Sequence, residues 1–350
     1  MSGSTTTEIV LPGIVEPEQL LVRRRPTAAP GPGQALVAVE ASGVSFAEQQ
    51  MRRGRYFAQP AFPFVPGYDL VGTVAAVGPG VGPDLVGRRV AALTKTGGWS
   101  STARLEAADL VPVPDGITPS EAETVVVNGV TAWQMLHRVA KVSSGGTILV
   151  HGANGGVGST LVQLARHAGI RVIGTSSARN RKAVSDLGAE PLDYASADLP
   201  ARVRALAPAG VDAVFDHVGG PGIVDSFRLL ARGGTLVAYG TASTRDDKGN
   251  PLLPVLALAA RLAVWNYLPN GRSASFYNVW GGRRRRQAFR TKLRDDLGQV
   301  FQLLAQGVLT AQVAAELPLE RAGEALRLAE SRTVVGKVVL VVDHGTGSGR

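Results

Sequence analysis

The chain of 350 residues lacks cysteine and has few histidines. Without cysteine it can form neither disulfides nor thiolate metal sites, and it has no catalytic thiol. The five histidines are not paired with a second histidine or a carboxylate at metal-ligand spacing; they are His137, His151, His167, His217 and His344. The sequence therefore predicts that no metal is bound.

Long hydrophobic runs are also missing, although apolar residues make up 45% of the chain and charged residues 19%. The most apolar stretch, Leu252–Val264, is interrupted by Pro254 and Arg261 and falls short of the ~20 residues of a membrane helix. The first residues, Met1–Glu8, lack the basic-then-apolar order of a signal peptide. We therefore expect a folded cytoplasmic protein without a membrane partner.

The length predicts two domains. Up to residue 126, short alternating strands at Gln34–Gly43, Val71–Val77 and Arg89–Leu93 lie between Pro- and Gly-rich turns, which predicts a β-rich domain. A helix is predicted at Val127–Lys141. After it, strands at 147–152, 171–175, 191–194, 211–217 and 235–240 alternate with helices at 159–167, 180–187, 199–207 and 221–231, and a further helix is predicted at 286–306. This alternation is typical of a doubly wound parallel sheet, and the fold class is α/β. The tails 1–7 and 344–350 are expected to be disordered.

A glycine-rich loop follows the first strand of the alternating region, in "ILVHGANGGVGST" (148–160). Gly155, Gly156 and Gly158, with Val157 between the last two, fit a dinucleotide fingerprint in which Ala153 replaces the first glycine and Gly152 stands one position earlier. The loop opens a predicted helix, whose N-terminal N–H groups favour a pyrophosphate. The sequence therefore predicts a Rossmann domain that binds a dinucleotide.

The end of the next strand predicts which dinucleotide is bound. An NAD site places a carboxylate there for the ribose 2′-hydroxyl, but no acid occurs between Val172 and Ala183. Instead Ser176, Ser177 and Arg179 follow the strand, and hydroxyls and cations suit a 2′-phosphate. NADPH is therefore favoured over NADH.

These motifs, with "VPGYDLVGTVAAVG", "NGVTAW", "LGAEPLDY", "FDHVGG", "GGTLVAYG" and "GKVVL", resemble the medium-chain dehydrogenase/reductase superfamily. The similarity is to its zinc-free quinone oxidoreductase branch, which includes the zeta-crystallins. The resemblance implies a GroES-like β-domain (1–126, completed by 308–350) and a Rossmann domain (127–307). Zinc alcohol dehydrogenases of the superfamily carry Gly-His-Glu where this chain has Gly67-Tyr68-Asp69, which also disfavours zinc.

The resemblance further implies cofactor-binding positions. Tyr194 would lie near the 2′-phosphate and Thr131 near the nicotinamide. The remaining positions would line the adenosine and nicotinamide tunnel, and they are Val218, Gly240, Thr241, Phe276 and Asn278.

The resemblance and the missing metal together predict direct hydride transfer to a quinone or to a carbon–carbon double bond conjugated to a carbonyl. Such a transfer creates an enolate that needs a hydrogen-bond donor, and Tyr56 matches a tyrosine found near the nicotinamide in relatives. The Asn-x-x-Asp of many zinc-free reductases is replaced by Ser45 and Glu48, so Ser45 is the second candidate for contact with substrate. Tyr68 is expected to be structural.

Two alternatives remain. Because the 45–48 segment departs from the Asn-x-x-Asp pattern, one alternative is a specialised biosynthetic enzyme that reduces or cyclises a large hydrophobic substrate. The net charge of +9 and the basic stretch "GGRRRRQAFRTKLR" (281–294) leave room for a nucleotide-gated nucleic-acid-binding protein, although a solvated helix start is the favoured explanation. A homodimer is expected from the resemblance and from a predicted edge strand at Ala274–Val279.

Overall fold

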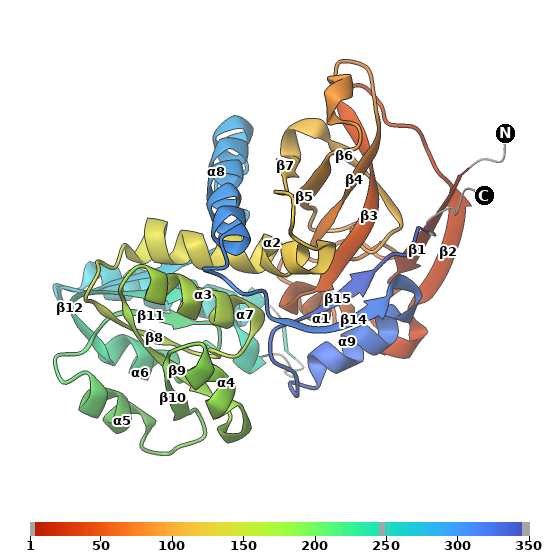
Figure 1. Ribbon diagram of the computed structural model, residues 1–350. Helices are drawn as coiled ribbons and strands as arrows, with labels where there is room; N and C mark the ends of the chain where they lie inside the picture. Colours follow the sequence, from red (N-terminus) through yellow and green to blue (C-terminus); the bar gives the residue numbers. More distant parts are fainter. Residues whose placement is uncertain (1–3, 245–248, 251, 345–350) are drawn as a thin grey trace. The chain divides into compact units, whose positions relative to one another are not determined.

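The computed structural model describes residues 4–244, 249–250 and 252–344 (Figure 1). The chain forms two compact units. We call Met1–Val127 together with Arg284–Arg350 the β unit, and Asn128–Arg283 the parallel-sheet unit. The predicted helix at 286–306, which the sequence had placed with the Rossmann domain, belongs to the β unit. There Arg290 of α8 (Arg286–Ala305) pairs with Asp109 at 2.6 Å.

The β unit is built on a seven-stranded sheet with the order β14-β15-β3-β4-β5-β7, in which β6 also pairs with β3. Its strands are β3 (Gln34–Val44), β4 (Asp69–Val77), β5 (Arg89–Leu93), β6 (Thr102–Glu106), β7 (Val111–Pro112), β14 (Val313–Pro318) and β15 (Lys337–Val341). In β3 the buried positions Ala35, Val37, Val39 and Ala41 alternate along the strand, and this period of two is why the strand could be predicted.

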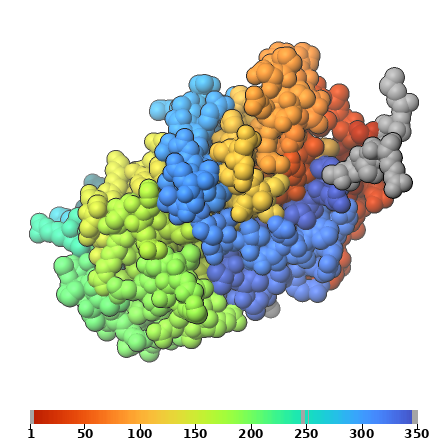
Figure 2. All heavy atoms as spheres, in the orientation of Figure 1, coloured from red at the N-terminus to blue at the C-terminus, as the bar shows by residue number. Residues whose placement is uncertain are grey.

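The C-terminal strands complete this sheet, because β15 pairs antiparallel with β3. Figure 2 shows the same contiguity on the surface, where the blue C-terminal segment borders the red and orange N-terminal one. The α-helices that lie wholly within the unit are α1 (Phe46–Arg52), α9 (Ala322–Glu330) and α8. The expected disorder of residues 1–7 is wrong for Thr5–Thr7, which begin β1 (Thr5–Val10) and pair with β2 (Leu21–Pro26).

The parallel-sheet unit holds six parallel strands in the order β10-β9-β8-β11-β12-β13, the Rossmann arrangement. The strands are β8 (Thr147–Val150), β9 (Arg171–Ser176), β10 (Glu190–Asp193), β11 (Val211–Asp216), β12 (Leu230–Ala238) and β13 (Ser273–Phe276). The connecting helices are α3 (Gly156–His167), α4 (Arg181–Asp186), α5 (Leu199–Leu206), α6 (Ile223–Arg228) and α7 (Leu252–Tyr267). The predicted fold class is confirmed.

Helix α2 (Pro119–Trp133) begins in the β unit and ends in the parallel-sheet unit, where a π-helical turn follows over Gln134–Ala140. It starts eight residues before the predicted start at Val127. Its first residue is a proline, which is tolerated there because the N–H groups of the first turn have no partner within the helix. Within the part of the chain that the structure describes, no helix has the length and apolarity to cross a bilayer.

Candidate functional site

The glycine-rich loop lies between the buried strand β8 and helix α3, as predicted. Gly155 is the N-cap of α3, so the N–H groups of the first turn point out of the helix end. Gly158 packs against the loop itself, since a Cβ at this position would lie 2.2 Å from the carbonyl oxygen of Gly152. Only glycine allows this approach, and it holds the helix N-terminus against the strand end in the way that a pyrophosphate site requires.

The residues predicted to hold a 2′-phosphate gather at the carboxyl ends of β9 and β10. The backbone N–H of Tyr194 donates to the carbonyl of Ser176 at 3.0 Å, which joins the two strand ends. The Ser177 hydroxyl oxygen is buried and has no hydrogen-bond partner among the described residues, whereas Arg179 is exposed. A buried hydroxyl beside an exposed guanidinium is a donor set that fits a phosphate.

The other predicted cofactor residues lie at the same edge of the sheet, except Thr131, which is buried in α2. Val218 and Thr241 belong to the loops after β11 and β12, which are joined because Ser243 N–H donates to Val218 O at 2.9 Å. Phe276 ends β13 and is partly exposed. The Asn278 side-chain oxygen accepts the Trp280 N–H and so shapes its own turn. Ligands of such sheets bind at the carboxyl ends of the strands.

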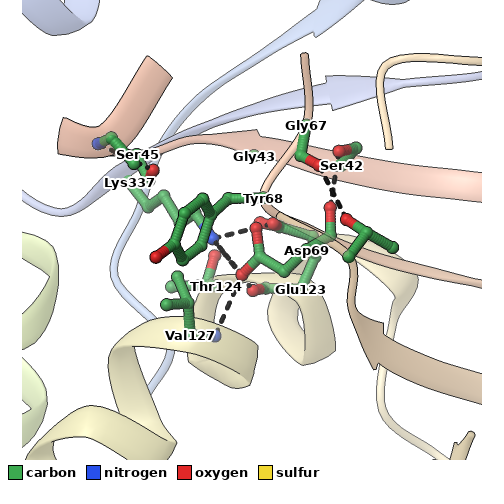
Figure 3. Close-up of polar contacts among 12 residues, drawn as sticks. Ser42, Gly43, Ser45, Gly67, Tyr68, Asp69, Glu123, Thr124, Val127 and Lys337 are labelled. Carbon is green, nitrogen blue, oxygen red and sulfur yellow. Dashed lines mark hydrogen bonds and ion pairs between the residues drawn. The ribbon is translucent and has the colours of Figure 1, made fainter. Parts of the chain in front are cut away.

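A buried ion cluster lies in the β unit (Figure 3). The ammonium of Lys337, at the start of β15, is 2.7 Å from Asp69 Oδ2 and 2.7 Å from Glu123 Oε1. Asp69 Oδ2 also accepts the backbone N–H of Val127 at 2.9 Å. All three ionisable side chains are at most 3% exposed. We call Asp69, Glu123 and Lys337 the buried ion cluster.

Burial and the charges of its members shift the pKa values in this cluster. Burial is the main reason why the pKa of Glu123 lies well above its ordinary value, and the neighbouring Asp69 raises it further. Burial alone would lower the pKa of Lys337, but Asp69 and Glu123 raise it by more. These shifts favour a Glu123 carboxyl that keeps its proton beside the Lys337 ammonium. Gly43 leaves room for it, since a Cβ there would lie 2.1 Å from Lys337 Cε.

The two candidate catalytic residues lie beside this cluster and differ in what they can offer. The Tyr56 hydroxyl is 2.8 Å from the Tyr68 hydroxyl, and Tyr68 N–H donates to Glu48 Oε1 at 2.6 Å. Burial raises the pKa of Tyr56, which keeps its proton on the phenol. Ser45 instead caps helix α1: its hydroxyl donates to the Glu48 carboxylate and accepts the N–H of Ala47 at 3.1 Å.

Sequence reasoning missed the buried ion cluster and gave Tyr68 no polar partner. In the sequence, Asp69 stands out only as a departure from a zinc motif, and Lys337 is the lysine of "GKVVL". A lysine inside a hydrophobic strand is the signal that could have found the cluster, because a buried ammonium needs a carboxylate.

Comparisons with known proteins agree with this architecture. Residues 31–115 match the family model of the alcohol dehydrogenase GroES-like domain, and residues 187–340 match that of the zinc-binding dehydrogenases. The human synaptic vesicle membrane protein VAT-1 homolog is 32% identical over 345 residues, which are 95% of this chain and 86% of that protein. A mycocerosic acid synthase-like polyketide synthase of Mycobacterium tuberculosis is 32% identical over 90% of this chain, which spans 14% of that protein.

Among solved structures, the quinone oxidoreductase of Escherichia coli in complex with NADPH superimposes with a TM-score of 0.84. It is 26% identical, and the match covers 96% of this chain and 99% of that one.

The zinc in one family description does not fit the residues present. Zinc sites use cysteine, histidine and carboxylate ligands, and the sequence has no cysteine. Among residues 4–244, 249–250 and 252–344, no group of three or more histidines or carboxylates is arranged to hold a metal ion. Where carboxylates do converge, the Lys337 ammonium supplies the positive charge.

The long match to the VAT-1 homolog and the structural match to a quinone oxidoreductase confirm the family that the motifs predicted. This chain belongs to the medium-chain dehydrogenase/reductase superfamily, in its zeta-crystallin-like branch.

Proposed function

We propose that the protein is an NADPH-dependent reductase that transfers a hydride, without a metal, to a quinone or to a double bond conjugated to a carbonyl. The observation that carries the proposal is the site at the ends of β8 and β9. There the N-terminus of α3, the buried Ser177 hydroxyl and the exposed Arg179 offer donors that suit phosphate groups, and the segment 172–183 holds no carboxylate. The similarity to an NADPH-binding quinone oxidoreductase supports the same conclusion.

NADPH, when bound, supplies the hydride, and the chain's own residues bind the cofactor, orient the substrate and protonate it. The loop 155–158 holds the pyrophosphate, and Ser177, Arg179 and Tyr194 hold the 2′-phosphate. The Tyr56 hydroxyl donates a hydrogen bond to the substrate oxygen on which negative charge accumulates. Its own oxygen accepts from Tyr68, which stabilises charge that develops on Tyr56 as the proton leaves. Ser45 is left in its capping role, since its hydroxyl proton is held by Glu48.

The proposal is tested by following NADPH oxidation with a panel of quinones, enones and saturated ketones of matched size. Turnover with quinones or enones but not with saturated ketones is expected, because only the conjugated acceptors give a stabilised enolate or hydroquinone. Equal rates with saturated ketones would contradict the proposal.

We predict that Arg179→Ala weakens NADPH binding and leaves NADH binding unchanged. A charge-assisted hydrogen bond contributes about 1.5–3 kcal/mol, so NADPH affinity should fall roughly 10- to 150-fold. Dissociation constants for both cofactors, measured by titration calorimetry, check this. The exposed Arg181→Ala is the matched control, and equal affinity of the wild type for NADPH and NADH would rule out the 2′-phosphate site.

We predict that activity is independent of metal. Prolonged dialysis against a chelator should leave turnover unchanged, and elemental analysis should find no stoichiometric zinc, because the residues that the structure describes hold no suitable ligand set. A rate that falls on chelation and returns with zinc would contradict this.

We predict a homodimer formed through α7. Four of its side chains are more than half exposed on one face, at the spacing of successive turns: Leu253, Leu256, Val264 and Tyr267. Edge pairing through β13 is restricted, because the Asn266 amide already bonds the N–H and C=O of Ala274 at 2.7 Å each. Light scattering should give twice the 36.4 kDa chain mass, and Leu256→Glu should give the monomer. A wild-type monomer at micromolar concentration would overturn the prediction.

A second candidate function is reduction within the biosynthesis of long acyl chains, and the match to a polyketide synthase supports it. An enoyl thioester then replaces the quinone as the acceptor, while the cofactor site stays the same. A comparison of kcat/KM for long-chain enoyl thioesters and for quinones separates the two. In the basic stretch 281–294, Arg283 stacks on Trp280 and Arg290 pairs with Asp109, so these two side chains have partners within the chain.

A further inference from the structure

A chain of polar side chains runs beneath the glycine-rich loop and joins three strand ends of the parallel-sheet unit. His151, directly after β8, lies 3.1 Å through Nδ1 from the Thr175 hydroxyl of β9. Through Nε2 it lies 3.1 Å from the Ser226 hydroxyl of α6. Ser226 in turn donates to Asp216 Oδ2, at the end of β11, at 2.7 Å. Thr175, Ser226 and Asp216 are at most 2% exposed.

The direction of every hydrogen bond in this series of side chains follows from the groups at the two ends of the series. The Ser226 proton goes to Asp216, so the Ser226 oxygen must accept, and His151 Nε2 carries a proton. In a neutral ring Nδ1 is then an acceptor, and it receives the Thr175 hydroxyl proton. The Thr175 oxygen in turn lies 3.3 Å from the Gly152 N–H and accepts from it. Burial lowers the pKa of His151, which favours this neutral ring.

The two ends of the chain are the two loops between which a dinucleotide lies in such a sheet. One end is Gly152, the first residue of the glycine-rich loop. The other is the turn after β11, where Asp216 Oδ1 accepts the N–H groups of Val218 at 2.8 Å and Gly219 at 2.9 Å. An ordered series of donors therefore connects the pyrophosphate loop to the 218–219 turn, with His151 at its centre.

We propose that His151, as the neutral Nε2–H tautomer, is a positioning residue that holds these two loops at the spacing that the dinucleotide needs. The inference rests on the dinucleotide binding in the proposed function. His151 does not touch the cofactor in this proposal. It acts through Gly152 on one side and through Asp216 on the other, so loss of either link should loosen both loops.

The experiment is a double-mutant cycle on NADPH affinity. Thr175→Val keeps the shape of the side chain and removes the hydroxyl, and Ser226→Ala removes the link to Asp216. Each change should weaken NADPH binding about 5- to 30-fold. Because both act through one ring, the double variant should be little weaker than the worse single one. In a His151→Phe background each change should have a smaller effect than in the wild type, since only its direct bond to Gly152 or Asp216 is then lost. Exposed His167→Gln is the matched control and should bind as the wild type does.

Long-range proton–nitrogen NMR spectra provide a readout that does not depend on the cofactor. With only five histidines in the chain, His151 can be assigned by its loss in His151→Phe. The signature of a neutral Nε2–H ring is expected, and an Nδ1–H ring or an imidazolium at neutral pH would overturn the inference. So would additive effects in the cycle, or variants that fold and bind NADPH within twofold of the wild type. A wild type that does not bind NADPH while His151 shows the expected tautomer would instead refute the proposed function.

Discussion

Replacement of Lys337 by methionine is expected to lower the free energy of unfolding by about 3–5 kcal/mol, the usual cost of removing one partner from a buried ion pair. Methionine keeps the length of the side chain, so little packing is lost. The Asp69 carboxyl group, which is fully buried, then keeps the Val127 N–H as a hydrogen-bond donor. Urea denaturation at neutral pH, followed by circular dichroism, measures the difference. A loss below about 1 kcal/mol would mean that water reaches the cluster.

The matched control is Glu123→Gln, which keeps the shape of the side chain and is neutral at every pH. Since burial raises the pKa of Glu123, the native chain keeps a proton there that the unfolded chain releases above its ordinary value of 4.5. The native state then binds more protons than the unfolded state, so this group makes stability fall as pH rises, by up to about 1.4 kcal/mol per pH unit. The glutamine variant lacks this fall and should gain on the wild type between about pH 5 and pH 8. A constant loss of stability over that range would show that Glu123 is ionised in the folded protein.

Tyr56→Phe is expected to lower turnover about 100-fold, at the low end of what general acid catalysis contributes, with NADPH affinity within about twofold of the wild type. The phenylalanine fills the same space, so the loss is confined to the hydroxyl that faces Tyr68. Single-turnover oxidation of NADPH, with binding measured separately, distinguishes the two steps.

The control for this variant is Tyr267→Phe on the predicted α7 dimer face, where the ring is kept and only an exposed hydroxyl is lost, so it should change neither turnover nor affinity. Full turnover in Tyr56→Phe would show that the proton comes from solvent and that Tyr56 only closes the site.

Local patterns predicted the strands and the cofactor loop because the residues that determine each of them lie in a short contiguous stretch of sequence. The strand β5 was predicted with its observed bounds, Arg89–Leu93. The start of α2 was not, because Val125 and Val126, before the predicted start at Val127, are β-branched and favour a strand over a helix. Helix α7 was not predicted as an element because apolar residues occur on all of its faces, which leaves no period of 3.6 to detect.

The residues of the candidate site also fall into two groups: those that a local pattern predicts and those that long-range contacts bring together. The glycine loop and the end of β9 are local, so their residues could be named in advance. In the buried ion cluster, Lys337 contacts Asp69 and Glu123, which lie 268 and 214 positions earlier in the sequence. A local sequence pattern cannot predict a contact between residues so far apart. The hydrogen-bond chain through His151 was hidden for the same reason, since Ser226 lies 75 residues further along.

The β unit is discontinuous along the chain, and this sets an order of events during synthesis on the ribosome. Residues 128–283 are contiguous, so the nucleotide-binding unit can form while the rest of the chain is still being made. The large sheet cannot be completed until β15 has emerged, because β14 joins it only through β15. Lys337 is the first residue of that strand, so its ammonium can pair with Asp69 only after nearly the whole polypeptide has been synthesised. A nascent chain stalled before residue 337 should therefore hold a folded nucleotide-binding unit beside an unfinished β unit.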